Sequence, residues 1–432
     1  MNYLRLDEPF ELEAGGVLPG ITIAYHTYGR LNADGSNVVW VCHALTANSD
    51  VARWWPGVVG EHGVVRPEDH FIVCANILGS CYGSSGPVGA GPGVGEHGVG
   101  FSGADGAEGF AGTGVGAEGF AGEGVGERRT GAEGIAGTGG GGRSAGAEGL
   151  GERGTAGAED FAATGGGERR ADGAKDFAAT GGRERRVGAE RPLYGDFPRI
   201  TIRDMVRAHI LLRQHLGIGK IHLLMGGSMG GYQAMEWVVM EPEVIGRLFL
   251  IATSPTESAW GIAVHTAQRL AIEADSSWRD ARPDAGQNGL KAARAIGILT
   301  YRNYGIMVQK QTDPDSEKLD GYRASSYMEY QGKKLVERFS AHSYWLLTKA
   351  MDSHHLGRGR GGDVEAVLRG IRQKTLVIGI TSDILCPFEE QRLLAAHLPN
   401  ARLISIDSAY GHDGFMVEGE KIASHLRDWL EE

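Results

Sequence analysis

The sequence predicts an α/β protein built on a mostly parallel, doubly wound sheet, and two observations support this fold class. Short apolar runs rich in β-branched residues alternate with amphipathic helical patterns over most of the chain. Such alternation is typical of parallel strands that are covered by helices on both faces. In addition, a serine stands between glycines at 226–230, where one apolar run passes into a helical pattern. Sheets of this kind build exposed nucleophiles at such turns.

Seven apolar runs of five or six residues are expected to be the strands of this sheet. The helix predicted over 201–217 begins with a capping pattern, Thr201-x-x-Asp204, and Gly217 provides its stop signal. Its apolar residues recur every three to four positions, which indicates one buried face. The expected strands are 21–25, 38–42, 71–75, 221–225, 248–252, 375–380 and 402–406.

The stretch 255–362 interrupts the alternation of strands and helices. It contains several helical patterns, including GLKAARAIGILTYR and ERFSAHSYWLLTKAMD, and it ends in the glycine-rich GRGRGG. A helical insertion between two late strands would cover the sheet as a lid. The predicted organisation is a first core part at 1–87, an insertion at 88–190, a core part with the serine turn at 191–254, a helical lid at 255–362 and a last core part at 363–432.

The insertion at 88–190 holds 35 of the 70 glycines of the chain. A unit similar to GAEGFAGTG recurs in it six times at irregular spacings of 10 to 16 residues. An irregular period with few large apolar residues does not build the stacked faces of a repeat protein, so we expect a disordered, low-complexity Gly/Ala/Glu-rich segment. No apolar strand precedes its glycines, which argues against a dinucleotide-binding loop. Its 16 acidic and 10 basic residues favour a solvated linker over a nucleic-acid contact.

Composition excludes several classes of function. The 432 residues carry a formal net charge of −11, which argues against a basic surface for nucleic acid or anionic membrane. No run reaches the roughly 18 apolar residues of a membrane span, and the N-terminus is acidic where a signal peptide would be basic. The four cysteines form no C-x-x-C pair, so we expect buried thiols, no metal site and a cytoplasmic location.

A serine, an acid and a histidine occur in the chain order of a nucleophilic triad. Ser228 lies in the G-x-S-x-G turn, Asp383 follows the strand expected at 375–380, and His412 follows the one at 402–406. A serine hydroxyl needs a base that is oriented by a carboxylate, and the carboxyl ends of parallel strands gather such groups. The backbone N–H groups of Met229 and Leu45 are expected to form the oxyanion hole.

The chain resembles the homoserine O-acetyltransferases of the α/β-hydrolase superfamily. The resemblance rests on HALT at 43–46, NILGSCYGSSGP at 76–87, YGDFPRITIRDMVRAH at 194–209, GGSMGGYQAMEW at 226–237, GLKAARAIGILTYR at 289–302, and SDILCP and IDSAYGHDGF near the end. It covers nearly all of the chain outside the insertion. Two features depart from the family pattern: HALT continues with Ala47 where members usually have glycine, and the insertion separates motifs that usually lie close together.

The resemblance implies an α/β-hydrolase fold and an acyltransferase of methionine biosynthesis, usually a homodimer. The implied co-substrate is acetyl-CoA, no cofactor is bound, and acetyl passes through an acyl-Ser228 intermediate to L-homoserine. Arg294 matches the family's arginine for the substrate carboxylate, and Asp413 matches its acid for the amino group. From the residues alone, Arg269 or Arg302 could equally be chosen in place of Arg294.

Four other functions remain open at this point. A few pocket side chains decide acyl length and acceptor, so homoserine O-succinyltransferase and serine O-acetyltransferase are close alternatives. The same triad also suits a serine esterase or hydrolase that uses water. A non-catalytic module with the repeat insertion as its interaction element is the fourth.

Overall fold

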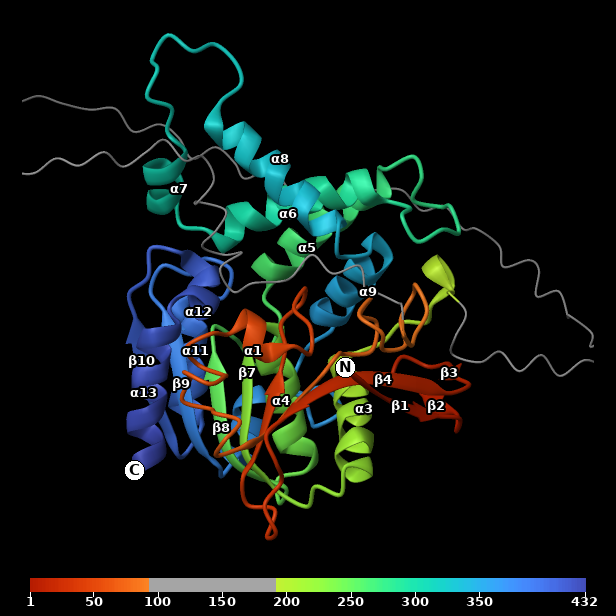
Figure 1. The fold of residues 1–432 in the computed structure, drawn as a ribbon, viewed down its shortest axis with the longest axis vertical. Coiled ribbons are helices and arrows are strands. Elements are labelled where there is room, and N and C mark those ends of the chain that lie inside the picture. Colours follow the sequence, from red (N-terminus) through yellow and green to blue (C-terminus); the bar gives the residue numbers. More distant parts are fainter. Residues whose placement is uncertain (93–191) are drawn as a thin grey trace, which may run out of the picture. The chain divides into compact units, whose positions relative to one another are not determined.

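The computed structural model describes residues 1–92 and 192–432 and contains one eight-stranded sheet in the order β1-β4-β6-β5-β7-β8-β9-β10 (Figure 1). The strands from β6 to β10 run parallel, whereas β1 and β4 pair antiparallel at one edge. The sheet strands are β1 (Asn2–Leu6), β4 (Ile21–Tyr28), β5 (Val38–Cys42), β6 (Phe71–Ala75), β7 (Ile221–Gly227), β8 (Ile245–Ile251), β9 (Lys374–Ile380) and β10 (Ala401–Ile406). A separate two-stranded sheet pairs β2 (Phe10–Glu11) with β3 (Val17–Leu18).

All seven predicted strands are confirmed, and the mostly parallel sheet is the predicted one. Strand β8 begins three residues earlier than expected, and it ends before Ala252, whose φ of 47° leaves the extended region. Strand β1 was not predicted. Its NYLRL pattern has one fully buried side chain, Leu4, because β1 lies at the edge of the sheet, and it therefore lacks the apolar run by which buried strands are recognised.

Alternate residues of each central strand enter two separate hydrophobic cores. In β5, Val38 and Trp40 pack with one core, and Val39 and Val41 pack with the other. The first core includes residues of α3 (Ile202–His215), α4 (Met229–Met240), α10 (Val364–Gly370) and α11 (Phe388–His397); the second includes residues of α1 (Val51–Trp54), α12 (Gly414–Val417) and α13 (Gly419–Glu431). Period-two burial with helices on both faces is the arrangement that the apolar strand runs predict.

The predicted capping box begins helix α3. The Thr201 side chain accepts a hydrogen bond from the Asp204 N–H, and the Asp204 carboxylate accepts one from the Thr201 N–H. Helix α3 ends at His215, and Gly217 follows with a φ of +67°, which is the left-handed conformation that favours glycine. Both predicted ends of this helix are confirmed.

Among the described residues, helices α5 to α9 lie between β8 and α10 in the sequence, and Figure 1 shows them at the end of the sheet where β8 terminates. They are α5 (Ala259–Glu273), α6 (Gln287–Tyr301), α7 (Tyr304–Gln311), α8 (Arg323–Val336) and α9 (Ala341–Asp352). One isolated antiparallel bridge, Thr256 to His355, joins the start of this segment to its end. The predicted disordered insertion lies almost wholly outside the described residues.

All four cysteines are free and buried, as their apolar surroundings predicted. Within residues 1–92 and 192–432, no helix has both the length and the apolar character that crossing a bilayer requires.

Glu236 on helix α4 forms ion pairs with α3 and with the glycine-rich segment that follows α9. Its carboxylate, only 4% exposed, receives the Arg203 Nε of α3 at 2.6 Å and the Arg360 Nη1 of GRGRGG at 2.8 Å. Arg203 and Arg358 also pair with Glu13 near the N-terminus. Because each charge is paired, the arrangement holds four distant segments together without leaving a buried charge uncompensated.

The Glu236→Ala variant is expected to lose about 3–5 kcal/mol of unfolding free energy, because two arginines would be left facing an empty, largely buried site. Urea denaturation followed by circular dichroism measures this loss. Glu365→Ala, which removes an exposed i,i+4 partner of Arg369, is the matched control and should change stability by less than about 0.5 kcal/mol. Equal effects of the two substitutions would contradict a stabilising role for Glu236.

Candidate active site

The turn between β7 and α4 presents Ser228 in a strained conformation. Ser228 has a φ of 54° and a ψ of −128°, a backbone region that side chains rarely adopt. Its N–H donates to the Ile251 carbonyl, and the Thr253 hydroxyl donates to the Ser228 carbonyl at 2.8 Å. Neighbouring strand β8 and the residues after it therefore hold the serine in this conformation. Strain of this kind is characteristic of nucleophile turns.

Glycines around Ser228 allow the close approach that this turn requires. A Cβ on Gly226 would overlap the Gly230 carbonyl, and a Cβ on Gly230 would overlap the Cys42 carbonyl at the end of β5. The second contact places the nucleophile turn directly against the segment that begins HALT. The G-x-S-x-G pattern is thus needed for two backbone approaches, one within the turn and one to β5.

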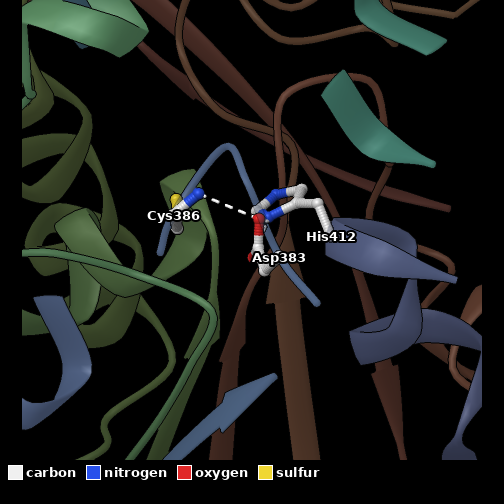
Figure 2. A group of neighbouring side chains, drawn as sticks. All are labelled: Asp383, Cys386 and His412. Atoms are coloured by element: carbon white, nitrogen blue, oxygen red, sulfur yellow. Dashed lines mark hydrogen bonds and ion pairs between the residues drawn. The ribbon is translucent and has the colours of Figure 1, made fainter. Parts of the chain in front are cut away.

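Asp383 follows β9 and is held by the backbone of its own loop. Its Oδ1 accepts hydrogen bonds from the N–H groups of Leu385 and Cys386 at 2.8 and 2.9 Å. Its Oδ2 lies 2.7 Å from the His412 Nδ1. Figure 2 shows Asp383 beside the His412 ring, with Cys386 on the next part of the same loop. The two backbone donors fix one carboxylate oxygen and leave the other for the histidine.

His412 bridges the acid and the serine. It lies in the short helix η2 (Gly411–Asp413) after β10, and its Nε2 is 2.9 Å from the Ser228 Oγ. Since the ionised Asp383 can only accept, Nδ1 carries the proton and Nε2 is free to accept from the serine hydroxyl. The structure therefore brings the three predicted residues together as a serine, base and acid chain.

The electrostatic surroundings of His412 favour its protonated form. Burial lowers the pKa of the imidazole, but the charge of Asp383, its hydrogen bond and the charges of Asp413 and Glu257 together raise it by more, and the net pKa lies above the ordinary histidine value. A raised pKa makes this histidine a stronger base than a free imidazole, which suits proton removal from a hydroxyl.

The two predicted oxyanion donors lie on segments that meet at the serine turn. Met229 is the first residue of α4, so its N–H lacks a partner within the helix. Leu45 follows β5, whose last carbonyl packs against Gly230. Ala47, where family members usually have glycine, is buried and does not have a positive φ. The alanine therefore introduces no left-handed backbone strain next to Leu45.

Both ring nitrogens of His43 bind backbone groups, which indicates a structural role for this histidine. Its Nδ1 donates to the Ala44 carbonyl at 2.8 Å, and its Nε2 accepts from the Ile77 N–H at 3.2 Å. Burial lowers the pKa of His43 to about 4. With both ring nitrogens bound to backbone groups, this histidine joins two loops and leaves His412 as the base.

The structure separates the three arginines that the sequence left as alternatives. Arg269 pairs with Asp352 at 2.6 Å, and Arg302 pairs with Asp413 at 3.0 Å. Among the described residues, no carboxylate lies within ion-pair distance of Arg294, whose guanidinium instead lies over the Tyr301 ring at 5.5 Å. Of the three, Arg294 is the one whose charge is not compensated by a described carboxylate.

Arg294 and Asp413 share one neighbourhood near His412. The Tyr301 ring centroid is 5.8 Å from that of His412. Burial raises the pKa of the Tyr301 phenol, while the Arg294 charge lowers it and the Asp413 charge raises it, so both charges act on the same buried group. Burial also raises the pKa of the Tyr327 phenol on α8, and the charges of Asp413 and Arg294 raise and lower this pKa, respectively. Arg294 therefore lies over the tyrosine ring that neighbours His412, and Asp413 is the residue next to His412 in the chain.

Sequence reasoning missed the ion pair between Arg302 and Asp413, and it assigned no role to Cys386. The helical spacing offered one usable signal: Arg294 and Tyr301 are seven residues apart and therefore share a face of α6. Another missed group is Glu390 on α11, where burial and the charges of Glu257 and Asp383 raise the pKa of the carboxyl to about 7. No local pattern marks such contacts, because they join separate segments.

Comparison with known proteins gives the family. Residues 37–419 match the family model described as alpha/beta hydrolase fold. The chain is 35% identical to the homoserine O-acetyltransferase of Cyclobacterium marinum, over 98% of this chain and 93% of that protein. It is 36% identical to the homoserine O-acetyltransferase of Chlorobaculum tepidum, over 98% of this chain and 92% of that protein.

Solved structures agree on the fold. The homoserine O-acetyltransferase from Bacillus anthracis superposes with a TM-score of 0.71 at 18% identity, covering 100% of this chain and 98% of that chain. An acetylester hydrolase from Corynebacterium glutamicum superposes with a TM-score of 0.67 at 18% identity, covering 100% and 96%. These likenesses concern the fold, and the identity over nearly the full length gives the family. The chain belongs to the homoserine O-acetyltransferase family and has the α/β-hydrolase fold.

Proposed function

We propose that this chain transfers acetyl from acetyl-CoA to the hydroxyl of L-homoserine, giving O-acetyl-L-homoserine and CoA in methionine biosynthesis. The hydrogen-bonded chain of Ser228, His412 and Asp383 is the observation that carries the proposal. The family membership selects an acyltransferase among the reactions that such a triad performs. A homodimer, which rests on the family resemblance, and a cytoplasmic location, which rests on the composition and the cysteines, are part of the proposal.

In the first half-reaction, the Ser228 Oγ attacks the thioester carbonyl of acetyl-CoA while His412 Nε2 takes its proton. The N–H groups of Leu45 and Met229 would stabilise the oxyanion that forms. When the intermediate collapses, the carbon–sulfur bond breaks and the imidazolium returns the proton to the CoA thiolate. The product of this step is acetyl-Ser228, and the neutral base is restored.

In the second half-reaction, His412 accepts the proton of the homoserine hydroxyl, whose oxygen attacks acetyl-Ser228. Collapse of the second intermediate releases O-acetylhomoserine and returns the proton to the Ser228 oxygen. Arg294 suits the substrate carboxylate, because a guanidinium binds a carboxylate in a bidentate fork. Asp413 would receive the ammonium group through the oxygen that does not face Arg302.

A CoA-release assay that crosses acetyl-CoA and succinyl-CoA with L-homoserine and L-serine tests the proposal. Beyond the one equivalent of CoA per chain that acylation of Ser228 sets free, continuous release with acetyl-CoA is expected only when L-homoserine is present. A preference for succinyl-CoA or L-serine would identify the succinyltransferase or serine acetyltransferase alternative. Equal release with water as the only acceptor would identify a hydrolase.

The acyltransfer rate is expected to fall at acid pH with an apparent pKa above the ordinary histidine value of about 6.5. The reason is that only the neutral imidazole accepts a proton from Ser228, and the pKa of His412 is raised. As pH rises through this pKa, the neutral fraction and therefore kcat/KM should increase. A kcat/KM profile measured from pH 5 to 9 checks this, and an acid limb below the ordinary histidine value would contradict it.

The Arg294→Met variant is expected to raise KM for homoserine about 10–150-fold, the equivalent of one charged hydrogen-bonded contact. Its acetylation by p-nitrophenyl acetate should stay within about twofold of wild type, since this reaction needs no homoserine. Arg282→Met, which removes an exposed arginine paired with Asp280 and Asp284, is the matched control. An unchanged KM in Arg294→Met would remove this residue from the acceptor site.

A further inference from the structure

A buried thiol lies beside the base and the acid of the triad. The Cys386 side chain is 5% exposed, and its Sγ, one carboxylate oxygen of Asp383 and one ring nitrogen of His412 all lie within 4.8 Å of one another. Figure 2 shows Asp383 beside the His412 ring and the backbone N–H of Cys386 facing the Asp383 carboxylate. The proposed acyl transfer uses the acid and the histidine but gives the thiol no task.

We propose that Asp383, Cys386 and His412 form an inhibitory binding site for a thiophilic divalent cation such as Zn²⁺. Sulfur, imidazole nitrogen and carboxylate oxygen are the three ligand types that Zn²⁺ takes in proteins. Bonds of about 2.0–2.3 Å place tetrahedral ligand atoms about 3.3–3.8 Å apart. The ligand atoms here all lie within 4.8 Å of one another, and His412 Nδ1 and Asp383 Oδ2 lie 2.7 Å apart, so shifts of roughly 1 Å or less would complete the site. A water molecule would occupy the fourth position.

The backbone already holds part of this site in place. The N–H groups of Leu385 and Cys386 bind Asp383 Oδ1, which fixes the carboxylate and the residue that bears the thiol in one loop. Fixed ligands and the Asp383 carboxylate both favour a dication over a monovalent ion. Mg²⁺ prefers oxygen ligands in octahedral geometry and does not suit the sulfur.

Metal binding would stop the reaction by occupying the base. The ion binds the His412 Nδ1 in place of the proton that now faces Asp383 Oδ2, and it binds the Cys386 sulfur as thiolate. The thiol proton leaves to solvent, and the imidazole keeps its one proton at Nε2. Since Nε2 would then donate, it could no longer accept the Ser228 proton. Removal of the metal by a chelator reverses each of these changes.

Metal binding by the full chain, measured without substrate, tests the proposal. Zinc should bind at one site per chain by isothermal titration calorimetry, and Co²⁺ should give a sulfur-to-cobalt charge-transfer band in the near ultraviolet. The Cys386→Ala variant is expected to lose this band and to weaken zinc binding at least about tenfold, because even outer-shell changes at metal sites cost that much. Cys74→Ala, which removes another buried thiol, should behave as wild type.

The expected inhibition by zinc rests on the proposed function, so zinc binding and acyl transfer are tested separately. Zinc should inhibit acetylation of wild type by p-nitrophenyl acetate, with recovery on adding EDTA, and Cys386→Ala should need at least about tenfold more zinc. Ser228→Ala should still bind zinc while lacking activity. Absent zinc binding, or equal binding by wild type and Cys386→Ala, would overturn the metal site whatever the activity. A wild-type protein that binds zinc but does not acylate homoserine would count against the proposed function only.

Discussion

Replacing Ser228 with alanine is expected to lower kcat/KM for CoA release at least about 10⁴-fold, since the acyl-enzyme can no longer form. The alanine would keep the strained turn, because Gly226 and Gly230 still allow the same backbone approaches. The binding groups and the oxyanion donors remain. The defect should therefore lie in kcat, and thermal unfolding should change little.

Steady-state kinetics and mass spectrometry of the acetylated protein measure this outcome. Wild type incubated with acetyl-CoA should gain one acetyl group, and Ser228→Ala should gain none. Ser343→Ala is the matched control, because Ser343 is a fully buried serine on α9 whose hydroxyl has no hydrogen-bond partner among the described residues. Activity of Ser228→Ala within tenfold of wild type would exclude the acyl-serine mechanism.

Asp383→Asn is expected to lower kcat about 10⁴-fold, the size of effect known for loss of the triad acid. The structure gives the reason. Oδ1 of residue 383 accepts from the N–H groups of Leu385 and Cys386, so the asparagine oxygen must stay on that side. The amide NH₂ would then face His412 Nδ1 and donate to it. The histidine proton would move to Nε2, where it faces Ser228 and prevents proton acceptance.

The pH profile distinguishes this tautomer effect from simple misfolding. Without the carboxylate charge that raises the pKa of His412, the remaining acid limb should move to lower pH. Asp407→Asn is the matched control, since Asp407 also follows a strand but bonds to the hydroxyl of Thr381 and not to the triad. A loss of activity shared by both variants would point to a general requirement for strand-end carboxylates and would contradict the specific role of Asp383.

The elements of the sheet and the triad were predictable because their signals are local. Most of the predicted strands are short apolar runs, and burial on both faces produces such runs. Likewise, Ser228 is marked by glycines within two residues, and Asp383 and His412 by their places after apolar runs. Strand β1 was missed because an edge strand buries few of its side chains.

The binding residues were less predictable, because their roles depend on partners far along the chain. Arg269 and Arg302 lie in helical patterns that resemble that of Arg294, and only the positions of Asp352 and Asp413 set them apart. The composition of GRGRGG predicts only a loop. In the structure, Arg360 of this loop binds Glu236, which is 124 residues away in the sequence.

The sequence by itself determined the parallel sheet, the strained serine turn and the order of the triad. These follow from periodicity, from small residues around the serine and from the rule that parallel strands bring their carboxyl ends to one edge. Only the tertiary structure decided which arginine lacks a described carboxylate partner, that Asp413 is paired with Arg302, and that Cys386 lies within reach of Asp383 and His412. The physical reason is that ion pairs and metal-ligand groups depend on distances of a few ångströms between distant segments, and these distances exist only once the chain has folded.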